Sequence, residues 1–168
     1  MSTFNIKQDE NFGALRQIKL IPVMNIVSIA IDTSDAVTLT YSGIGNPMDM
    51  DFTFGSARFS EPEKKTSQGV SLTQQIEFFI PGDNLTLLQK INALLNKRFF
   101  AAIFYYDEDT AWRLAGNTDK NPNDVYIGLE LKKDFDSGKK PSDLKGYKFF
   151  LACESRLRAY WLSALVHI

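Results

Sequence analysis

Alternation of apolar and polar side chains runs through most of the chain and predicts β-strands. In residues 25–32, Val27, Ile29 and Ile31 share one face, and residues 36–41 form a second β-branched run. The most regular alternation is at 48–54, where Met or Phe occupies every second position. The same reasoning predicts strands at 15–20, 70–80, 98–106, 111–116, 125–133, 146–153 and 156–161.

One helix interrupts the strands. The run 70–80 ends at Pro81-Gly82, and beyond it the apolar residues recur at the spacing of a helical stripe. Asp83 or Asn84 is the expected N-cap, which predicts a helix over about 84–95. Because a helix of about three turns is not stable alone in water, we expect its stripe to pack on a sheet through Leu85, Leu88, Ile91 and Leu95. A helix that binds a partner is the alternative.

Residues 98–106 are apolar on both faces of the expected strand. A strand of this composition is buried on both sides. We expect one face to meet the helix and the other to meet a second sheet, a barrel interior or another subunit. Asp107, Glu108 and Asp109 then form the tip of a hairpin that returns through 111–116.

Polar stretches divide the chain. Residues 1–14 have no sustained period and are expected to form a flexible or partner-ordered arm, followed by a single β-rich domain over 15–168. Residues 60–69 and 134–145 predict long exposed loops; the first is alternatively an extended hairpin tip or a segment ordered by a neighbouring subunit. Near the C-terminus, residues 157–166 fit either a strand or a helix.

These elements predict a mainly β fold of the α+β class. The expected architecture is an antiparallel β-barrel or sandwich with one amphipathic helix, at about 84–95, packed on it. Thirteen Phe, six Tyr and two Trp agree with this class, since aromatic side chains suit a pleated, half-buried surface.

Few residues are suited to proton transfer or metal binding. Cys153 and His167 are the only cysteine and the only histidine, so a zinc site of His and Cys within one chain is not expected. Cys153 has apolar neighbours and is expected to be a buried thiol. Asp49 and Asp51 are expected to be solvated on the polar face of their strand.

Segment 117–124 places Asp119, Asn121 and Asn123 at the first, third and fifth positions of a calcium loop. Position six is Asp124, where that loop needs glycine, so a calcium site is not expected. We assign no catalytic, cofactor-binding or metal-binding residue from the sequence, and no cofactor.

Charge and hydropathy restrict the partners. With 19 basic and 20 acidic residues the net charge is −1, so no basic field favours nucleic acid and no specific nucleic-acid partner is expected. The first residues lack the apolar core of a signal peptide. No apolar run approaches the roughly 20 residues of a membrane helix. We therefore expect cytoplasmic synthesis and no membrane partner.

The order of elements over about 68–160 resembles small structural proteins of phages and prophages of the Bacteroidetes type, in the style of tail-tube and tail-associated proteins. The residues that carry the resemblance are the I-P-G-D entry to the helix at 80–83, the apolar strand and hairpin at 99–116, the Ser-Gly loop at 137–138 and the aromatic strand at 146–155. The resemblance implies a β-barrel or sandwich, flanked by a helix, that assembles into rings within a virion or phage-tail-like particle.

The leading hypothesis is therefore a non-enzymatic, self-assembling structural protein, tail-tube-like, whose partners are copies of itself in a ring or other tail proteins. The charged residues of the two polar loops are the candidate subunit contacts: Glu61, Glu63, Lys64, Lys65, Lys139 and Lys140. The alternative is a monomeric β-barrel module that binds a small apolar ligand in a cavity lined by Met48, Met50, Phe52 and Phe54. An enzyme that uses only carboxylates is a third hypothesis.

Overall fold

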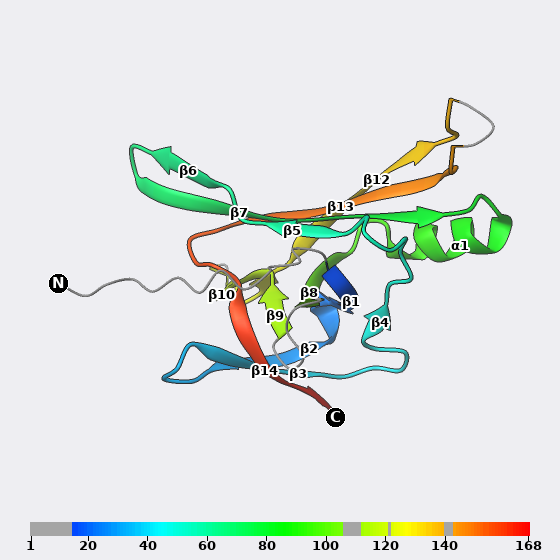
Figure 1. The fold of residues 1–168 in the computed structure, drawn as a ribbon. Coiled ribbons are helices and arrows are strands. Elements are labelled where there is room, and N and C mark those ends of the chain that lie inside the picture. The colour runs from blue at the N-terminus through cyan, green and yellow to red at the C-terminus, as the bar shows by residue number, and fades with distance from the viewer. Residues whose placement is uncertain (1–14, 106–111, 121, 140–142) are drawn as a thin grey trace.

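The structure is a computed structural model that describes residues 15–105, 112–120, 122–139 and 143–168. It consists mainly of strands, with one α-helix, α1 (Leu85–Leu94), at one side (Figure 1). The expected arm at 1–14 and the acidic turn at 107–109 lie outside the described residues. The mainly β class with one helix is confirmed.

The strands follow the chain in the order β1 (Leu15–Pro22), β2 (Ile26–Ile31), β3 (Ala36–Tyr41), β4 (Met48–Asp49), β5 (Arg58–Ser60), β6 (Glu63–Thr66), β7 (Gly69–Pro81), β8 (Arg98–Tyr105), β9 (Trp112–Ala115), β10 (Asn117–Lys120), β11 (Tyr126–Ile127), β12 (Leu129–Asp136), β13 (Gly146–Ser155) and β14 (Tyr160–His167). A short 3-10 turn, η1 (Val23–Asn25), separates β1 from β2 directly after Pro22.

Twelve strands form one hydrogen-bonded sheet, in the order β2-β3-β14-β9-β8-β12-β13-β7-β5, with β1 on β8, β4 on β1 and β6 on β7. Neighbouring strands are antiparallel except β14 and β3, which run parallel with Trp161 opposite Ala36. The sheet is therefore mixed rather than wholly antiparallel. The parallel pair arises because β14 inserts between β3 and β9, which come from distant parts of the chain, instead of following β3 through a hairpin.

Strand β8 connects two halves of the sheet. One side of β8 pairs with β1, while the other side pairs first with β12, where Phe99 faces Leu129, and then with β9, where Ala101 faces Ala115. From this junction β12, β13, β7 and β5 form an upper layer in Figure 1, and β2, β3 and β14 form a lower layer.

The two faces of β8 belong to two different cores. Phe99, Ala101 and Ile103 lie in an upper core with residues of β7, β13 and α1, whereas Phe100 and Ala102 lie in a lower core with residues of β3 and β14. All five side chains are fully buried. The expectation of burial on both faces, with the helix on one of them, is confirmed for Phe99–Phe104; Arg98 is exposed, and residue 106 lies outside the described residues.

Strand β7 shows the predicted alternation. Leu72, Gln74, Ile76 and Phe78 are buried, and the residues between them are half-buried. The Phe78 ring stacks on Phe149 of the neighbouring strand β13, with ring centroids 5.1 Å apart. Apolar side chains on the inner face of this pair thus form one wall of the upper core.

Helix α1 begins after Asn84, whose side chain accepts a hydrogen bond of 2.8 Å from the Leu87 backbone N–H. Ile91 is its only fully buried residue, and Leu87, Leu88 and Leu94 are partly buried against the upper core. Leu85 is 69% exposed, so the expectation that it packs on the sheet was wrong. It is the first residue of the helix, one turn and more away from Ile91, where the helix meets the core.

The regular alternation at 48–54 does not produce a long strand. Met48 and Asp49 pair with β1, and the Met50 N–H still donates to the Ile18 carbonyl of that strand. Beyond this point the Thr53 N–H donates to the Phe79 carbonyl near the end of β7. The chain therefore crosses the end of the upper core instead of following β1. Met48, Met50 and Phe52 still pack against that core, whereas Phe54 is exposed.

Three polar segments are more regular than expected. Residues 63–66 form β6, so the stretch 60–69 is a hairpin tip, one of the forms that its composition allowed. Strand β12 continues to Asp136, which shortens the expected loop at 134–145. Residues 117–120 form β10, which pairs with β11. At the C-terminus β14 is a strand, which decides between the two predictions for 157–166.

Candidate assembly surfaces

The two acidic candidates of the first polar segment make contacts within the chain. Glu61 Oε1 accepts a 2.6 Å hydrogen bond from the Ala159 backbone N–H, and Glu63 Oε1 lies 3.1 Å from Arg158 Nη2. The turn between β13 and β14 is thereby attached to the base of β6. The paired residues are more than 90 positions apart in the sequence, so the composition of the loop alone could not predict these contacts.

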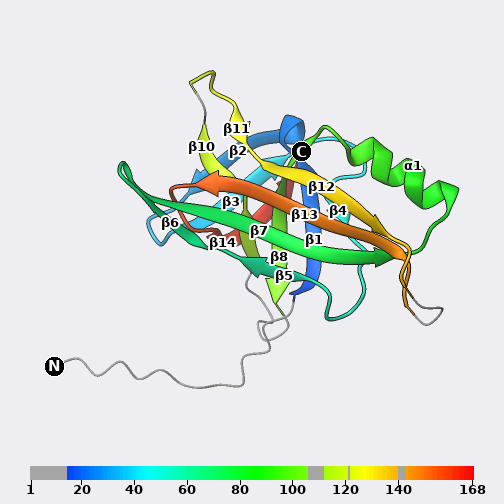
Figure 2. The same ribbon diagram turned by 90° about the horizontal axis from the view of Figure 1, so that it is seen from above.

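The two basic candidates, Lys64 and Lys65, are exposed on β6. Strands β6 and β7 pair from Glu63 opposite Leu72 to Thr66 opposite Gly69, and Val70 near the tip is 51% exposed. Figures 1 and 2 show that this hairpin projects from one end of the upper layer. It presents cationic and apolar side chains together, away from the body of the molecule.

The opposite end of the upper layer carries the tip of β12 and β13 (Figures 1 and 2). Asp143 Oδ2 accepts from the Lys139 backbone N–H at 2.9 Å, and Asp136 Oδ1 accepts from the Gly138 N–H at 2.9 Å. Lys140 lies outside the described residues. Phe135 and Leu144 are 49% and 64% exposed, so this tip also combines charged and apolar side chains.

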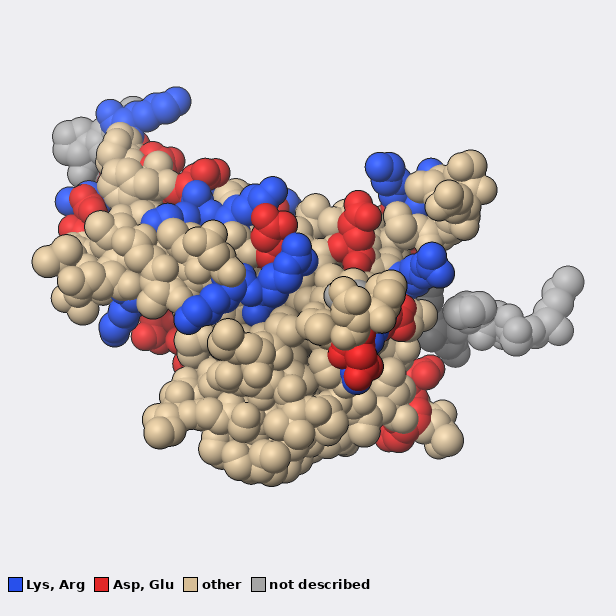
Figure 3. Space-filling view, turned by 180° about the vertical axis from the view of Figure 1, so that it is seen from behind, with Lys and Arg blue, Asp and Glu red and all other residues tan. Residues whose placement is uncertain are grey.

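A third surface, which the sequence analysis did not single out, covers the lower layer. We name it the neutral face and define it by the outward side chains Ser28, Ala30, Thr38, Thr40, Ala164 and Val166. Figure 3 shows the lower half of the molecule without blue or red atoms except at one side. The signal was present in the sequence, because residues 20–31, 36–48 and 159–168 contain no Asp, Glu, Lys or Arg.

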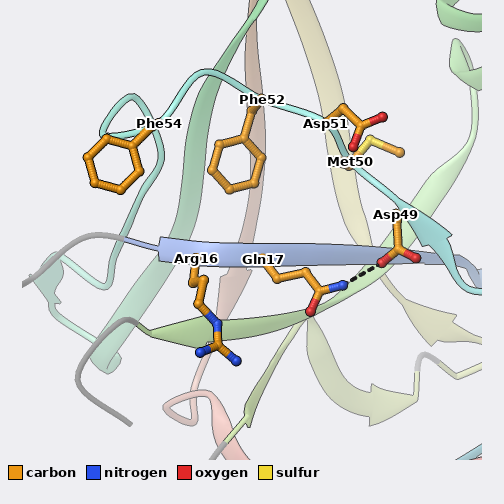
Figure 4. A pocket seen from close by; sticks show the side chains of 7 residues that line it. All are labelled: Arg16, Gln17, Asp49, Met50, Asp51, Phe52 and Phe54. Atoms are coloured by element: carbon orange, nitrogen blue, oxygen red, sulfur yellow. Dashed lines mark hydrogen bonds between the residues drawn. The ribbon is translucent and has the colours of Figure 1, made fainter. Parts of the chain in front are cut away.

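A hollow of about 400 Å³ lies between β1 and the segment that follows β4. Figure 4 shows Met50, Phe52 and Phe54 above β1 and the polar side chains Arg16 and Gln17 beside it. Asp49 closes one end, where its Oδ1 accepts a 2.9 Å hydrogen bond from Gln17 Nε2. Three of the four Met and Phe residues proposed for an apolar cavity line this hollow, but charged and amide groups make up its other wall.

The cysteine and the histidine both occupy structural positions. Cys153 is buried in the upper core, and burial raises the pKa of its thiol to about 11. His167 Nε2 lies 3.1 Å from the Gly43 carbonyl oxygen, and its ring packs edge-on against Tyr41 in the lower layer. Cys153 thus belongs to the upper core, whereas His167 is exposed on the lower layer.

In the described part of the chain, no three His, Cys, Asp or Glu side chains lie close enough together to hold a metal ion. None of the helices that the structure describes combines the length and the apolar character needed to cross a bilayer.

In comparisons with known proteins, the chain matches no protein-family model, no curated protein and no solved structure.

Proposed function

We propose that this chain is a non-enzymatic structural protein of a phage or prophage-derived particle, tail-tube-like, that self-assembles through its strands and its two projecting hairpins. The observation that carries the proposal is the pair of projections at opposite ends of the upper layer, β6–β7 at one end and β12–β13 at the other (Figures 1 and 2).

The projections are costly for an isolated molecule. A two-stranded hairpin with no packed face is marginally stable in water, and all four residues of β6 are exposed. Exposed apolar residues near both tips, Val70 and Phe135, add to that cost. Contact with a neighbouring subunit would bury these side chains and stabilise both hairpins.

The arrangement also suits a ring. The two projections differ in sequence and point in opposite directions, so a contact between one end of a subunit and the next subunit joins unlike surfaces. Such heterologous contacts close into rings when the rotation between subunits completes a circle. The candidate contacts Lys64, Lys65 and Lys139 lie at the two ends.

Charge reversal at the hairpin tests this proposal. Lys64→Glu should weaken self-association by about tenfold or more, since an interfacial cation becomes an anion. Lys97→Glu, an equally exposed lysine beyond α1, is the matched control and should leave association unchanged. Sedimentation across a concentration series measures the effect, and electron microscopy looks for rings. A wild-type chain that stays monomeric at all concentrations would refute the proposal.

The second candidate, a module that binds a small apolar ligand, is favoured by one observation: Met50, Phe52 and Phe54 line the hollow beside β1. Native mass spectrometry of freshly purified protein should then detect a bound small molecule, and Phe52→Ala should reduce its occupancy. A spectrum that contains only the mass of the bare chain would contradict this candidate.

A further inference from the structure

The neutral face has small side chains at its centre. Thr38 of β3 stands between Ala30 of β2 and Ala164 of β14, and Thr40 stands between Ser28 and Val166. Residues that face one another across paired strands point to the same side of the sheet. The alternate residues of β3, Val37 and Leu39, are fully buried in the lower core, so this row points outward.

Larger apolar side chains are also exposed on the strands of the lower layer and on the segments next to them. Seven of the 14 large apolar residues that stand exposed in the described part of the chain belong to β2, β14 and the segments that adjoin the lower layer: Met24, Val27, Ile31, Ile44, Trp161, Val166 and Ile168. An exposed apolar surface of this concentration usually marks an interaction site.

The boundaries of the neutral face are defined by charged groups. Asp32 and Asp35 lie in the turn between β2 and β3, and Arg113 of β9 lies with its guanidinium carbon 4.3 Å from the centre of the Trp161 ring. The free edge of β2 is partly closed, because the Ile29 N–H donates to the Tyr126 hydroxyl at 3.2 Å. The outward face, rather than the strand edge, is therefore the accessible surface.

We propose that the neutral face binds the same face of a second copy of this chain across a two-fold axis. A contact between two uncharged faces leaves no charge buried without a partner. In the described residues the hairpins and the upper layer all carry charged side chains, so the neutral face of another copy is the matching surface that this chain offers. A surface that matches itself forms an isologous, two-fold contact.

The small side chains of the neutral face suit a close contact between two sheets. Alanine, serine and threonine side chains at its centre let the backbones of two facing sheets approach one another more closely than large side chains would.

Other occupants fit the surface less well. A membrane surface or a nucleic acid would be recognised by lysine and arginine side chains, and the three uncharged segments contain none. The proposal rests on the self-assembly described under the proposed function and adds a second contact to it. The hairpins make the heterologous contact, and the neutral face makes the two-fold contact.

Two variants that place a charge on the face test the proposal in the full chain. Thr38→Lys puts a cation at the centre, and Ala30→Lys does the same on the exposed strand β2. Ala93→Lys, at an exposed alanine of α1 outside both proposed contacts, is the matched control. We expect sedimentation to show association weakened by about tenfold or more for the first two variants and unchanged for the control. Circular dichroism melting checks that each variant is folded. If Thr38→Lys does not fold, the association of Ala30→Lys tests the proposal.

Ionic strength separates the two contacts. Raising salt from about 0.05 to about 0.5 M should weaken the hairpin contact by screening and leave the two-fold contact intact or strengthened. If both face variants associate like the wild type while Lys64→Glu does not, the neutral face is not an interface and the proposed function stands. If the wild type is monomeric throughout, both proposals are overturned.

Discussion

At the scale of single residues, Gln74 is the polar side chain on which the interior depends most directly. It is only 1% exposed, on the apolar face of β7. Its Oε1 accepts from the Gly116 N–H at 2.7 Å and its Nε2 donates to the Leu157 carbonyl at 3.1 Å. One amide therefore links β7 to the end of β9 and to the turn before β14.

Replacing Gln74 by Leu should lower the free energy of unfolding by about 1–3 kcal/mol, because the buried Gly116 N–H loses its acceptor. Gln75→Leu is the matched control on the half-buried side of the same strand, with an expected change within about 0.5 kcal/mol. Urea denaturation of both variants measures the difference. Equal losses would show that the hydrogen bonds of Gln74 contribute no more than ordinary strand packing.

Cys153 gives a pH-dependent prediction. Burial raises the pKa of its thiol from 9.0 to about 11, so the folded state holds the proton more tightly than the unfolded chain. The resulting stabilisation is complete below pH 9 and is lost as the pH rises through about 11, and two pKa units correspond to about 2–3 kcal/mol. Between these pH values the wild type should lose more stability than Cys153→Ala. Parallel pH curves for the two proteins would contradict this.

At the scale of elements, the sequence predicted burial correctly where the periodicity of a single strand was enough to tell which side chains face inward. The alternation of 70–80 put Leu72, Gln74 and Ile76 on one face, and that face is buried. The run 98–106, apolar on both faces, indicated that β8 is covered on both sides by apolar side chains. Both patterns depend on the period of a single strand, which does not require knowledge of its neighbours.

The failures concern partners rather than periods. Residues 48–54 alternate well, but their hydrogen bonds to β1 end at Met50, and Thr53 bonds instead to Phe79 near the end of β7. Glu61 and Glu63 stay candidate subunit contacts, and their local charge did not indicate their contacts with Ala159 and Arg158, which come from the far end of the chain. Long-range register determines such contacts, and a local pattern contains no record of it.

Helix α1 provides a prediction at this scale, because the sequence placed Leu85 and Ile91 on the same packed stripe. Ile91 is 2% exposed and Leu85 69% exposed. Ile91→Ala should cost about 2–4 kcal/mol through the cavity it leaves, and Leu85→Ala less than about 0.5 kcal/mol. Chemical denaturation of both variants gives the comparison. A large loss for Leu85→Ala would show that the helix packs as the sequence pattern implied.

At the scale of the whole molecule, β8 determines how the layers relate. Its neighbouring residues Phe99 and Phe100 are both fully buried, one in the upper core and one in the lower core. Because successive residues of a strand point to opposite faces, β8 contributes side chains to both cores. If β8 detaches from one core, the other core also loses buried side chains. The two cores should therefore unfold together, as expected of one domain over 15–168.

Two probes distinguish one cooperative unit from two. The two tryptophans, Trp112 and Trp161, lie in the paired strands β9 and β14, and Cys153 belongs to the upper core. Tryptophan fluorescence and the reactivity of the thiol should therefore report the same urea midpoint, which is the mark of two-state unfolding. Phe100→Ala, a change confined to the lower core, should cost about 3–5 kcal/mol and lower both midpoints equally. If only the fluorescence midpoint falls, the layers are independent units, and β8 joins two domains rather than dividing the interior of one.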